Sequence, residues 1–89
     1  MILKPSFEIV DVAGEYMAIP VGKLADSFGG IVTLSETAAF LLKNMKTEKT
    51  VDELAHLLSQ EYDIDEKKAF DEVSKAIVLF GNLSLIEDK

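Results

Sequence analysis

Residues 29–42 read GGIVTLSETAAFLL and change character halfway. The first half is rich in β-branched residues, which is typical of a strand, and the second half has the composition of a helix. Ser35 stands between the halves and is a good N-cap. The pattern predicts a strand over 28–34 that leads directly into a helix from Glu36 to about Met45.

Two further strands are predicted before this stretch. Phe7–Val12 (FEIVDV) and Glu15–Val21 (EYMAIPV) are separated only by Ala13-Gly14, which is a turn signal. Pro20 limits the pairing available near the end of the second strand. Short links between successive strands predict an antiparallel meander, which needs helices on one face to be stable.

Two further helices are predicted after the helix that begins at Glu36. Thr50 and Glu53 have the spacing of a capping box, and the apolar pattern that follows ends near Tyr62. Asp65 is the predicted N-cap of a third helix that runs to about Asn82. The order β-β-β-α-α-α predicts one α+β domain over residues 1–89, with a three-stranded antiparallel sheet followed by three helices and a winged-helix-like outline.

Composition excludes several classes of function. The 89 residues include no cysteine, which excludes disulfides, thiolate zinc sites and iron–sulfur clusters. The net charge is −7 and all nine basic residues are lysines, so nucleic-acid binding is not expected. The N-terminal residues resemble neither a signal peptide nor a membrane span. We therefore expect a cytoplasmic protein that binds no membrane.

The third helix has more apolar surface than a surface helix needs. At about 100° per residue its apolar side chains cover an arc of roughly 180°, against about 100° for a typical surface helix. Such a helix either packs on two sides or leaves an apolar strip exposed, and exposed strips often mark binding sites. The apolar residues of this arc are Ala69, Phe70, Val73, Ala76, Ile77, Leu79, Phe80 and Leu83.

The third strand is the edge of the predicted meander and carries no feature that protects an edge. Natural edges usually contain charge or proline, and residues 29–34 contain neither. This edge is therefore covered by the chain itself, paired in a homodimer, or kept for a peptide. A peptide added as a strand would gain main-chain hydrogen bonds and place side chains against the third helix.

Catalytic chemistry is not expected from this sequence. His56 is the only histidine and lies in the predicted second helix, where it is interpreted as an ordinary helix residue. Asp63, Asp65 and Glu66 lack the glycine and terminal glutamate of a calcium loop. No serine has the partners of a catalytic triad, and no phosphate-binding loop is present. The chain is predicted to be neither an enzyme nor a holder of a metal or cofactor.

Four segments in order resemble the PqqD family, the coenzyme PQQ synthesis protein D-like proteins. They are G-G-x-V-x-L-S-E-T-A-A (29–39), K-T-V-D-E-L (49–54), E-Y-D-I-D (61–65) and E-V-x-x-A-I-x-x-F (72–80). The resemblance implies a peptide chaperone, a recognition element for ribosomally made, modified peptides. Such a protein binds a leader peptide as an added strand between its third strand and third helix, and presents it to a modifying enzyme, commonly a radical SAM enzyme.

Carried onto this chain, the resemblance implies a groove between the third strand and one edge of the third helix. The other edge, with Ala76, Leu79 and Leu83, stays open as an alternative. The family often has glycine where this chain has Ser84, and a Cys-Asp-Gly-like turn at residues 44–46, which favours a PqqD-like protein serving a peptide other than the PQQ precursor. The expected peptide-binding residues are Ile31, Val32, Thr33, Leu34, Phe70, Val73, Ser74 and Ile77.

Two other functions fit the predicted order of elements. A winged-helix DNA-binding regulator fits the topology, but residues 65–83 contain four acids and three lysines, whereas a recognition helix is normally basic. A structural module is the other alternative, in which the open edge pairs two copies into a homodimer.

Overall fold

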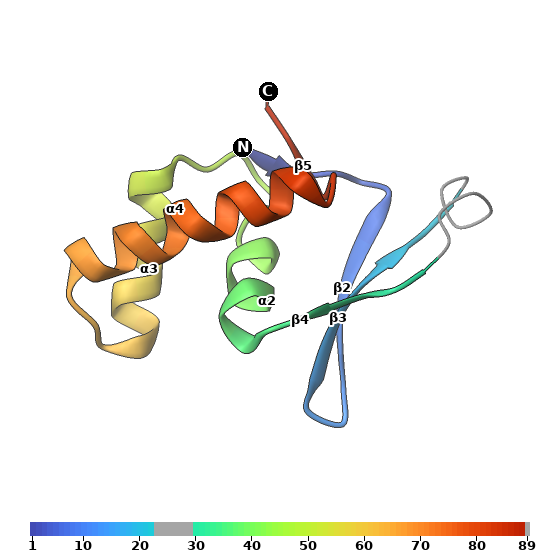
Figure 1. Ribbon diagram of the computed structural model, residues 1–89, viewed down its shortest axis with the longest axis horizontal. Helices are drawn as coiled ribbons and strands as arrows, with labels where there is room; N and C mark the ends of the chain where they lie inside the picture. The colour runs from blue at the N-terminus through green and yellow to red at the C-terminus, as the bar shows by residue number, and fades with distance from the viewer. Residues whose placement is uncertain (23–29, 89) are drawn as a thin grey trace.

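A three-stranded antiparallel sheet and three helices make up most of the structure, a computed structural model that describes residues 1–22 and 30–88 (Figure 1). The predicted order β-β-β-α-α-α is confirmed, and a small two-stranded sheet near the chain ends adds to it. The elements are β1 (Ile2–Leu3), β2 (Phe7–Val12), β3 (Glu15–Pro20), β4 (Val32–Leu34), α2 (Glu36–Lys43), α3 (Val51–Tyr62), α4 (Glu66–Asn82) and β5 (Ile86–Glu87).

The main sheet has the order β2-β3-β4, so β4 is an edge strand as predicted. A tight hairpin joins β2 to β3 and pairs Phe7 with Pro20 at one end and Val12 with Glu15 at the other. Both turn residues have positive φ, 54° at Ala13 and 82° at Gly14, as a two-residue hairpin turn requires. Strand β4 pairs antiparallel with β3 over three residues.

The strand bounds differ from the prediction at two places. Strand β3 ends at Pro20 rather than Val21, and the Val21 N–H donates to the carbonyl of Ser6 (2.8 Å) just beyond it. Strand β4 begins at Val32, whereas the sequence predicts a start at 28. Residues 28 and 29 lie outside the described part of the chain, and Gly30 and Ile31 precede the strand without joining it. Glycine is a poor strand former, which favours a later start.

Side-chain caps set the beginnings of all three helices. Ser35 Oγ accepts from the Ala38 N–H (3.1 Å), and Asp65 Oδ1 accepts from the Lys67 N–H (3.0 Å), as predicted. Helix α2 ends at Lys43, two residues before the predicted end. The Asn44 side chain donates to the carbonyl of Phe40 (2.9 Å), which satisfies an end carbonyl and stops the helix there.

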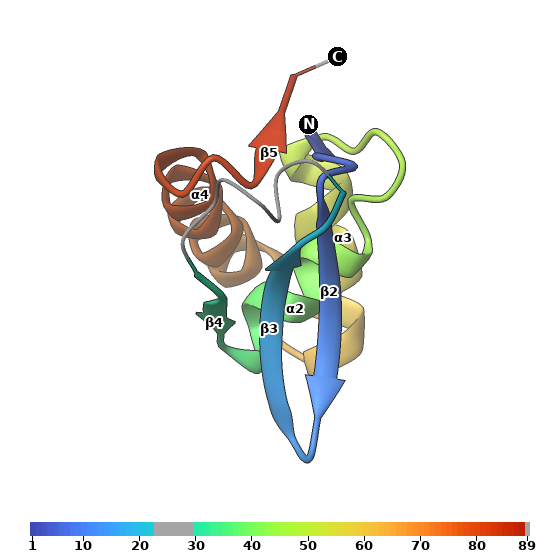
Figure 2. The ribbon, with the colours of Figure 1, turned by 90° about the vertical axis from the view of Figure 1, so that its right-hand side faces the viewer.

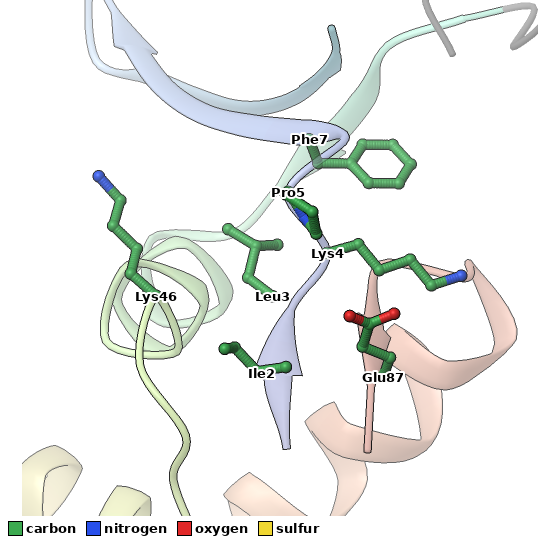
Figure 3. Close-up of a pocket in the computed structure, with 7 residues that line it drawn as sticks. All are labelled: Ile2, Leu3, Lys4, Pro5, Phe7, Lys46 and Glu87. Carbon is green, nitrogen blue, oxygen red and sulfur yellow. The ribbon is translucent and has the colours of Figure 1, made fainter. Parts of the chain in front are cut away.

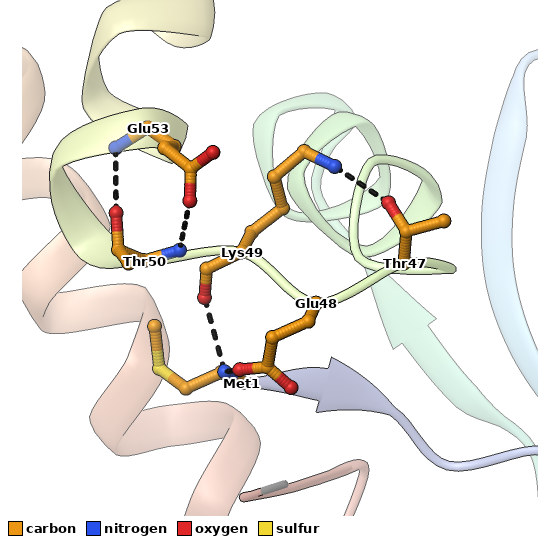
Figure 4. A network of polar contacts seen from close by, with 6 residues as sticks. All are labelled: Met1, Thr47, Glu48, Lys49, Thr50 and Glu53. Atoms are coloured by element: carbon orange, nitrogen blue, oxygen red, sulfur yellow. Dashed lines mark hydrogen bonds and ion pairs between the residues drawn. The ribbon is translucent and has the colours of Figure 1, made fainter.

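The predicted capping box of α3 is present (Figure 4). Thr50 Oγ1 accepts from the Glu53 N–H (3.1 Å), and Glu53 Oε1 accepts from the Thr50 N–H (2.9 Å). This backbone hydrogen bond lowers the pKa of Glu53. The N-terminal ammonium of Met1 forms an ion pair with Glu48 and donates to the carbonyl of Lys49 (3.0 Å), so the chain start lies against the start of α3.

Helix α4 contributes to the core and also leaves apolar side chains in solvent. Val73 and Phe80 are 0 % exposed, whereas Phe70, Val78 and Leu79 are 42 %, 64 % and 49 % exposed. The predicted excess of apolar surface is therefore confirmed, with part of it left in solvent. No helix in the described residues is both long and apolar enough to cross a bilayer.

The sequence patterns did not predict the sheet of β1 and β5, which pairs Ile2 with Glu87 and Leu3 with Ile86. Further backbone bonds hold β1, from the Leu3 N–H to the carbonyl of Met45 (2.8 Å) and from the Lys4 N–H to that of Leu85 (3.0 Å). Two-residue strands show no periodicity, so pattern analysis cannot detect them.

Candidate functional site

The open edge of β4 is the first part of the candidate site. Tyr16 pairs with Leu34 and Ala18 with Val32, which uses one side of β4. Among the described residues no strand pairs with its other side. Leu34 and Val32 point towards the core, since Leu34 is 7 % exposed and Val32 packs against the core, whereas Thr33 is exposed on the opposite face. The edge contains neither charge nor proline.

A pocket next to the end of β4 is the second part. It has a volume of about 300 Å³ and lies between the first turn of α2 and one edge of α4. The first turn of α2 follows β4 directly, so the pocket begins at the residue after the strand. Figure 2 shows β4 at the side of the sheet nearest α4. The lining residues are Ser35, Thr37, Ala38, Glu72, Lys75, Ala76 and Leu79.

Apolar and charged side chains have distinct places in this pocket. Ala38 and Ala76 are buried or half-buried and Leu79 is about half exposed, so together they offer an apolar surface. Glu72 and Lys75 are exposed and carry opposite charges three residues apart on α4. We call the edge of β4 together with this pocket the β4–α4 groove. The groove can take an extended chain with apolar side chains and one or two charges.

The structure places the predicted helix residues apart from this pocket. Val73 is 0 % exposed and belongs to the core. Ile77 lines a separate pocket with Met1, Gly81 and the C-terminal strand. Phe70 is exposed, but it precedes Leu79 by nine residues, about two and a half turns of helix, so the two lie on opposite sides of α4. Ser74 is half-buried and is not among the pocket residues.

The edge of α4 that lines this pocket is thus the one that the sequence leaves open as the alternative. Ala76 and Leu79 line the pocket, while Leu83 is half-buried and packs against the core. Which of these residues contact a peptide stays a prediction. Three lining residues at the start of α2 were not predicted, although the absence of any loop between strand and helix is a signal for them. They are Ser35, Thr37 and Ala38.

Two larger hollows lie away from β4. One, of about 360 Å³, is formed by β1 and its surroundings, where the Lys4 and Glu87 side chains extend towards the same region (Figure 3). The other lies on the outer face of α3 beside His56, whose Nδ1 is 2.8 Å from Glu66 Oε1. Over residues 1–22 and 30–88 no three His, Cys, Asp or Glu side chains cluster as a metal site.

The fold recurs in two solved structures that are distant in sequence. One, "TbiB1 in Complex with the TbiA(beta) Leader Peptide", has a TM-score of 0.77 and 13 % identity, with 100 % of this chain and 98 % of that chain covered. The other, "Lasso peptide synthetase B1 complexed with the leader peptide", has a TM-score of 0.73 and 15 % identity, with 97 % and 95 % covered.

Sequence comparison identifies the family. Comparison with curated protein sequences gives no match. The family model described as "Coenzyme PQQ synthesis protein D (PqqD)" matches residues 9–86, which begin within β2 and include β3, β4 and all three helices. The chain therefore belongs to the PqqD family.

Proposed function

We propose that this chain recognises the leader of a ribosomally made precursor peptide, binds it as a strand added to β4, and presents it to a modifying enzyme such as a radical SAM enzyme. The observation that carries the proposal is the unprotected edge of β4 beside an open pocket. Membership of the PqqD family supports it, as do two structures of the same fold whose names describe leader-peptide complexes.

Strand addition would give affinity and the pocket would give selectivity. Each main-chain hydrogen bond to β4 contributes on the order of 1 kcal/mol net. Side chains of an added strand alternate between its two faces, so every second one would point to the side of the sheet that the helices cover. Those side chains would meet Ala38, Ala76 and Leu79. This is the usual division of roles in peptide recognition by strand addition.

The charged residues of the pocket would add a second level of selectivity. Lys75 and Glu72 flank the apolar surface on α4. An apolar side chain of the leader would be accepted between them, and a neighbouring acidic side chain would pair with Lys75. Like charges placed opposite each other would be rejected, which discriminates between peptides more than it adds affinity.

The proposed contacts are Ile31 to Leu34 on the strand, with Ala76 and Leu79 as the main contacts on α4. We place Phe70, Ser74 and Ile77 outside the first contacts because they lie towards the other side of the helix. Val73 supports the groove from within the core. The protein itself is proposed to bind and hold the peptide, while the bond-making chemistry belongs to its enzyme partner.

Calorimetry with the precursor peptide encoded beside the gene tests the proposal. Two synthetic leaders would be N-methylated at alternate amides, one set at odd and one at even positions. Alternate N–H groups of a strand point to the same side, so one set removes the hydrogen bonds to β4 and the other leaves them intact. We expect micromolar or tighter binding of the parent leader, retained by one methylated leader and lost by the other. Equal binding of both, or of a scrambled leader, would contradict strand addition.

A further inference from the structure

The outward face of the main sheet is unusually apolar. Antiparallel register places Val10 opposite Met17 and Glu8 opposite Ile19 on the face away from the helices. A solvated sheet face normally carries polar side chains at such positions. Here the apolar side chains form one continuous area, which we call the outer sheet patch. It consists of Val10, Val12, Met17, Ile19 and Ile31, with Ile31 just before β4.

This patch belongs to no core within the described residues. The inward-facing strand residues Ile9, Tyr16 and Val32 pack against the core, whereas Val10, Met17 and Ile19 do not. Val12 and Ile31 are 56 % and 58 % exposed, whereas Val10, Met17 and Ile19 are half-buried. Figure 2 shows β2 and β3 in front, with the helices behind them. A contiguous apolar area of this kind on a small soluble domain marks a binding surface.

Charge around the patch restricts what can cover it. Glu8 and Glu15 point to the same face, and none of the outward positions of β2, β3 and β4 is basic. Two copies packed through this face would bring like charges together, and an anionic lipid surface would be repelled. A protein that surrounds aliphatic side chains with lysine or arginine would be complementary.

The patch also adjoins the β4–α4 groove. Thr33 lies on β4 and points outward, opposite Met17 on β3. A peptide strand added beside β4 would turn alternate side chains to this same outward face. A protein seated on the patch would therefore touch the outward half of the peptide while the other half is held in the groove.

We infer that the outer sheet patch is the docking surface for the peptide-modifying enzyme, which binds it through an apolar area flanked by basic residues. This inference rests on the proposed function for the identity of the partner. It explains how one small domain could hold a peptide and position it. The peptide extends the sheet at the edge of β4, and the enzyme covers the outward face of the same sheet.

The test measures enzyme binding and leader binding separately. The probes are the purified modifying enzyme encoded beside the gene and the leader peptide, each titrated against wild type and against Met17→Lys and Val12→Lys. Val78→Lys is the matched control for Val12→Lys, because Val78 is 64 % and Val12 56 % exposed but Val78 lies on α4. We expect both patch variants to weaken enzyme binding about tenfold or more, a change of 1.4 kcal/mol, with leader affinity unchanged. Val78→Lys should change neither.

Several outcomes would overturn the inference. These are undiminished enzyme binding by both folded patch variants, no enzyme binding by wild type, or a wild-type dimer that Met17→Lys dissociates, which would assign the patch to a second copy. Failure of the proposed function looks different, because wild type would then fail to bind the leader. Circular dichroism melting checks that each variant is folded. If Met17→Lys does not fold, Val12→Lys, at the tip of the hairpin, carries the test alone.

Discussion

The Tyr62 hydroxyl donates a hydrogen bond of 3.0 Å to Glu36 Oε2, which joins the end of α3 to the first turn of α2. The Tyr62 ring also packs edge-on against Phe40, with centroids 5.7 Å apart. The first turn of α2 follows β4 and lines the β4–α4 groove. The contact with Tyr62 therefore fixes one wall of the groove to the end of α3.

The same contact makes Tyr62 a reporter of folding at high pH. Burial, together with the Glu36 hydrogen bond and charge, raises the pKa of Tyr62 from 10.0 to about 12. The folded protein therefore favours the neutral phenol. The resulting stabilisation is complete below the unfolded pKa of about 10 and is lost as the pH rises through the folded value. We expect the free energy of unfolding to fall between these limits, as measured by urea denaturation across that range.

Ultraviolet titration of tyrosinate checks the assignment, because the chain has two tyrosines and no tryptophan. In Tyr16→Phe the single remaining phenol should titrate near 12 when folded and near 10 in urea. Glu36→Gln should lower the folded value, since it removes the negative charge but leaves the burial. A folded value near 10 in Tyr16→Phe would contradict the structure.

Ser84 has a positive φ of 59° directly after the C-cap of α4, the position where helices usually carry glycine. The left-handed conformation costs a non-glycine residue about 1–2 kcal/mol. Glycine avoids this cost but loses more conformational freedom on folding, which offsets part of the gain. We expect Ser84→Gly to stabilise the protein by about 0.5–1 kcal/mol in urea denaturation. Ser74→Gly, the same change inside α4, should instead destabilise it by about 0.5 kcal/mol.

The N-cap of α2 should affect both stability and binding. Ser35→Ala removes the acceptor for the Ala38 N–H and should cost about 1 kcal/mol. The first turn would fray, and leader affinity should fall because that turn lines the groove. Thr50→Ala removes the equivalent cap of α3, away from the groove, and should lower stability by a similar amount without changing leader affinity. Ser35→Asp, which still caps the helix, should restore both stability and leader affinity. Equal leader affinities for Ser35→Ala and Thr50→Ala would contradict a contact between the leader and the first turn of α2.

Local chemistry explains why most of the fold could be predicted. Ser35 and Thr50 cap backbone N–H groups only three residues away, and the alternation of β2 is complete within six residues. Both signals can therefore be read from a short stretch of sequence. The pairing of β1 with β5 joins residues more than eighty positions apart through two-residue strands, and no local pattern encodes it. Membership of the PqqD family was predicted from four short segments and is confirmed by a match over residues 9–86.

The candidate site was predictable only in part, for a related reason. The open edge follows from strand order and the lack of charge or proline, both visible in the sequence. The rotation of α4 about its axis does not, because apolar residues occur on both edges and packing decides which one meets β4. The structure has Leu79 in the lining of the pocket and Phe70 on the opposite side of the helix, about 180° around its axis.

Glutamate substitutions on α4 provide a direct test of which edge the leader contacts. Leu79, Phe70 and Val78 are all exposed apolar residues of one helix, at 49 %, 42 % and 64 %, so each substitution adds the same charge at a similar cost to folding. Only Leu79 lines the β4–α4 groove. Leu79→Glu would place a carboxylate against an apolar peptide side chain, and we expect leader affinity to fall about tenfold or more in calorimetry. Phe70→Glu and Val78→Glu should bind as wild type. Loss of binding in Phe70→Glu, with Leu79→Glu unaffected, would move the site to the opposite edge of α4, because no rearrangement short of rotating the helix brings both side chains to one peptide.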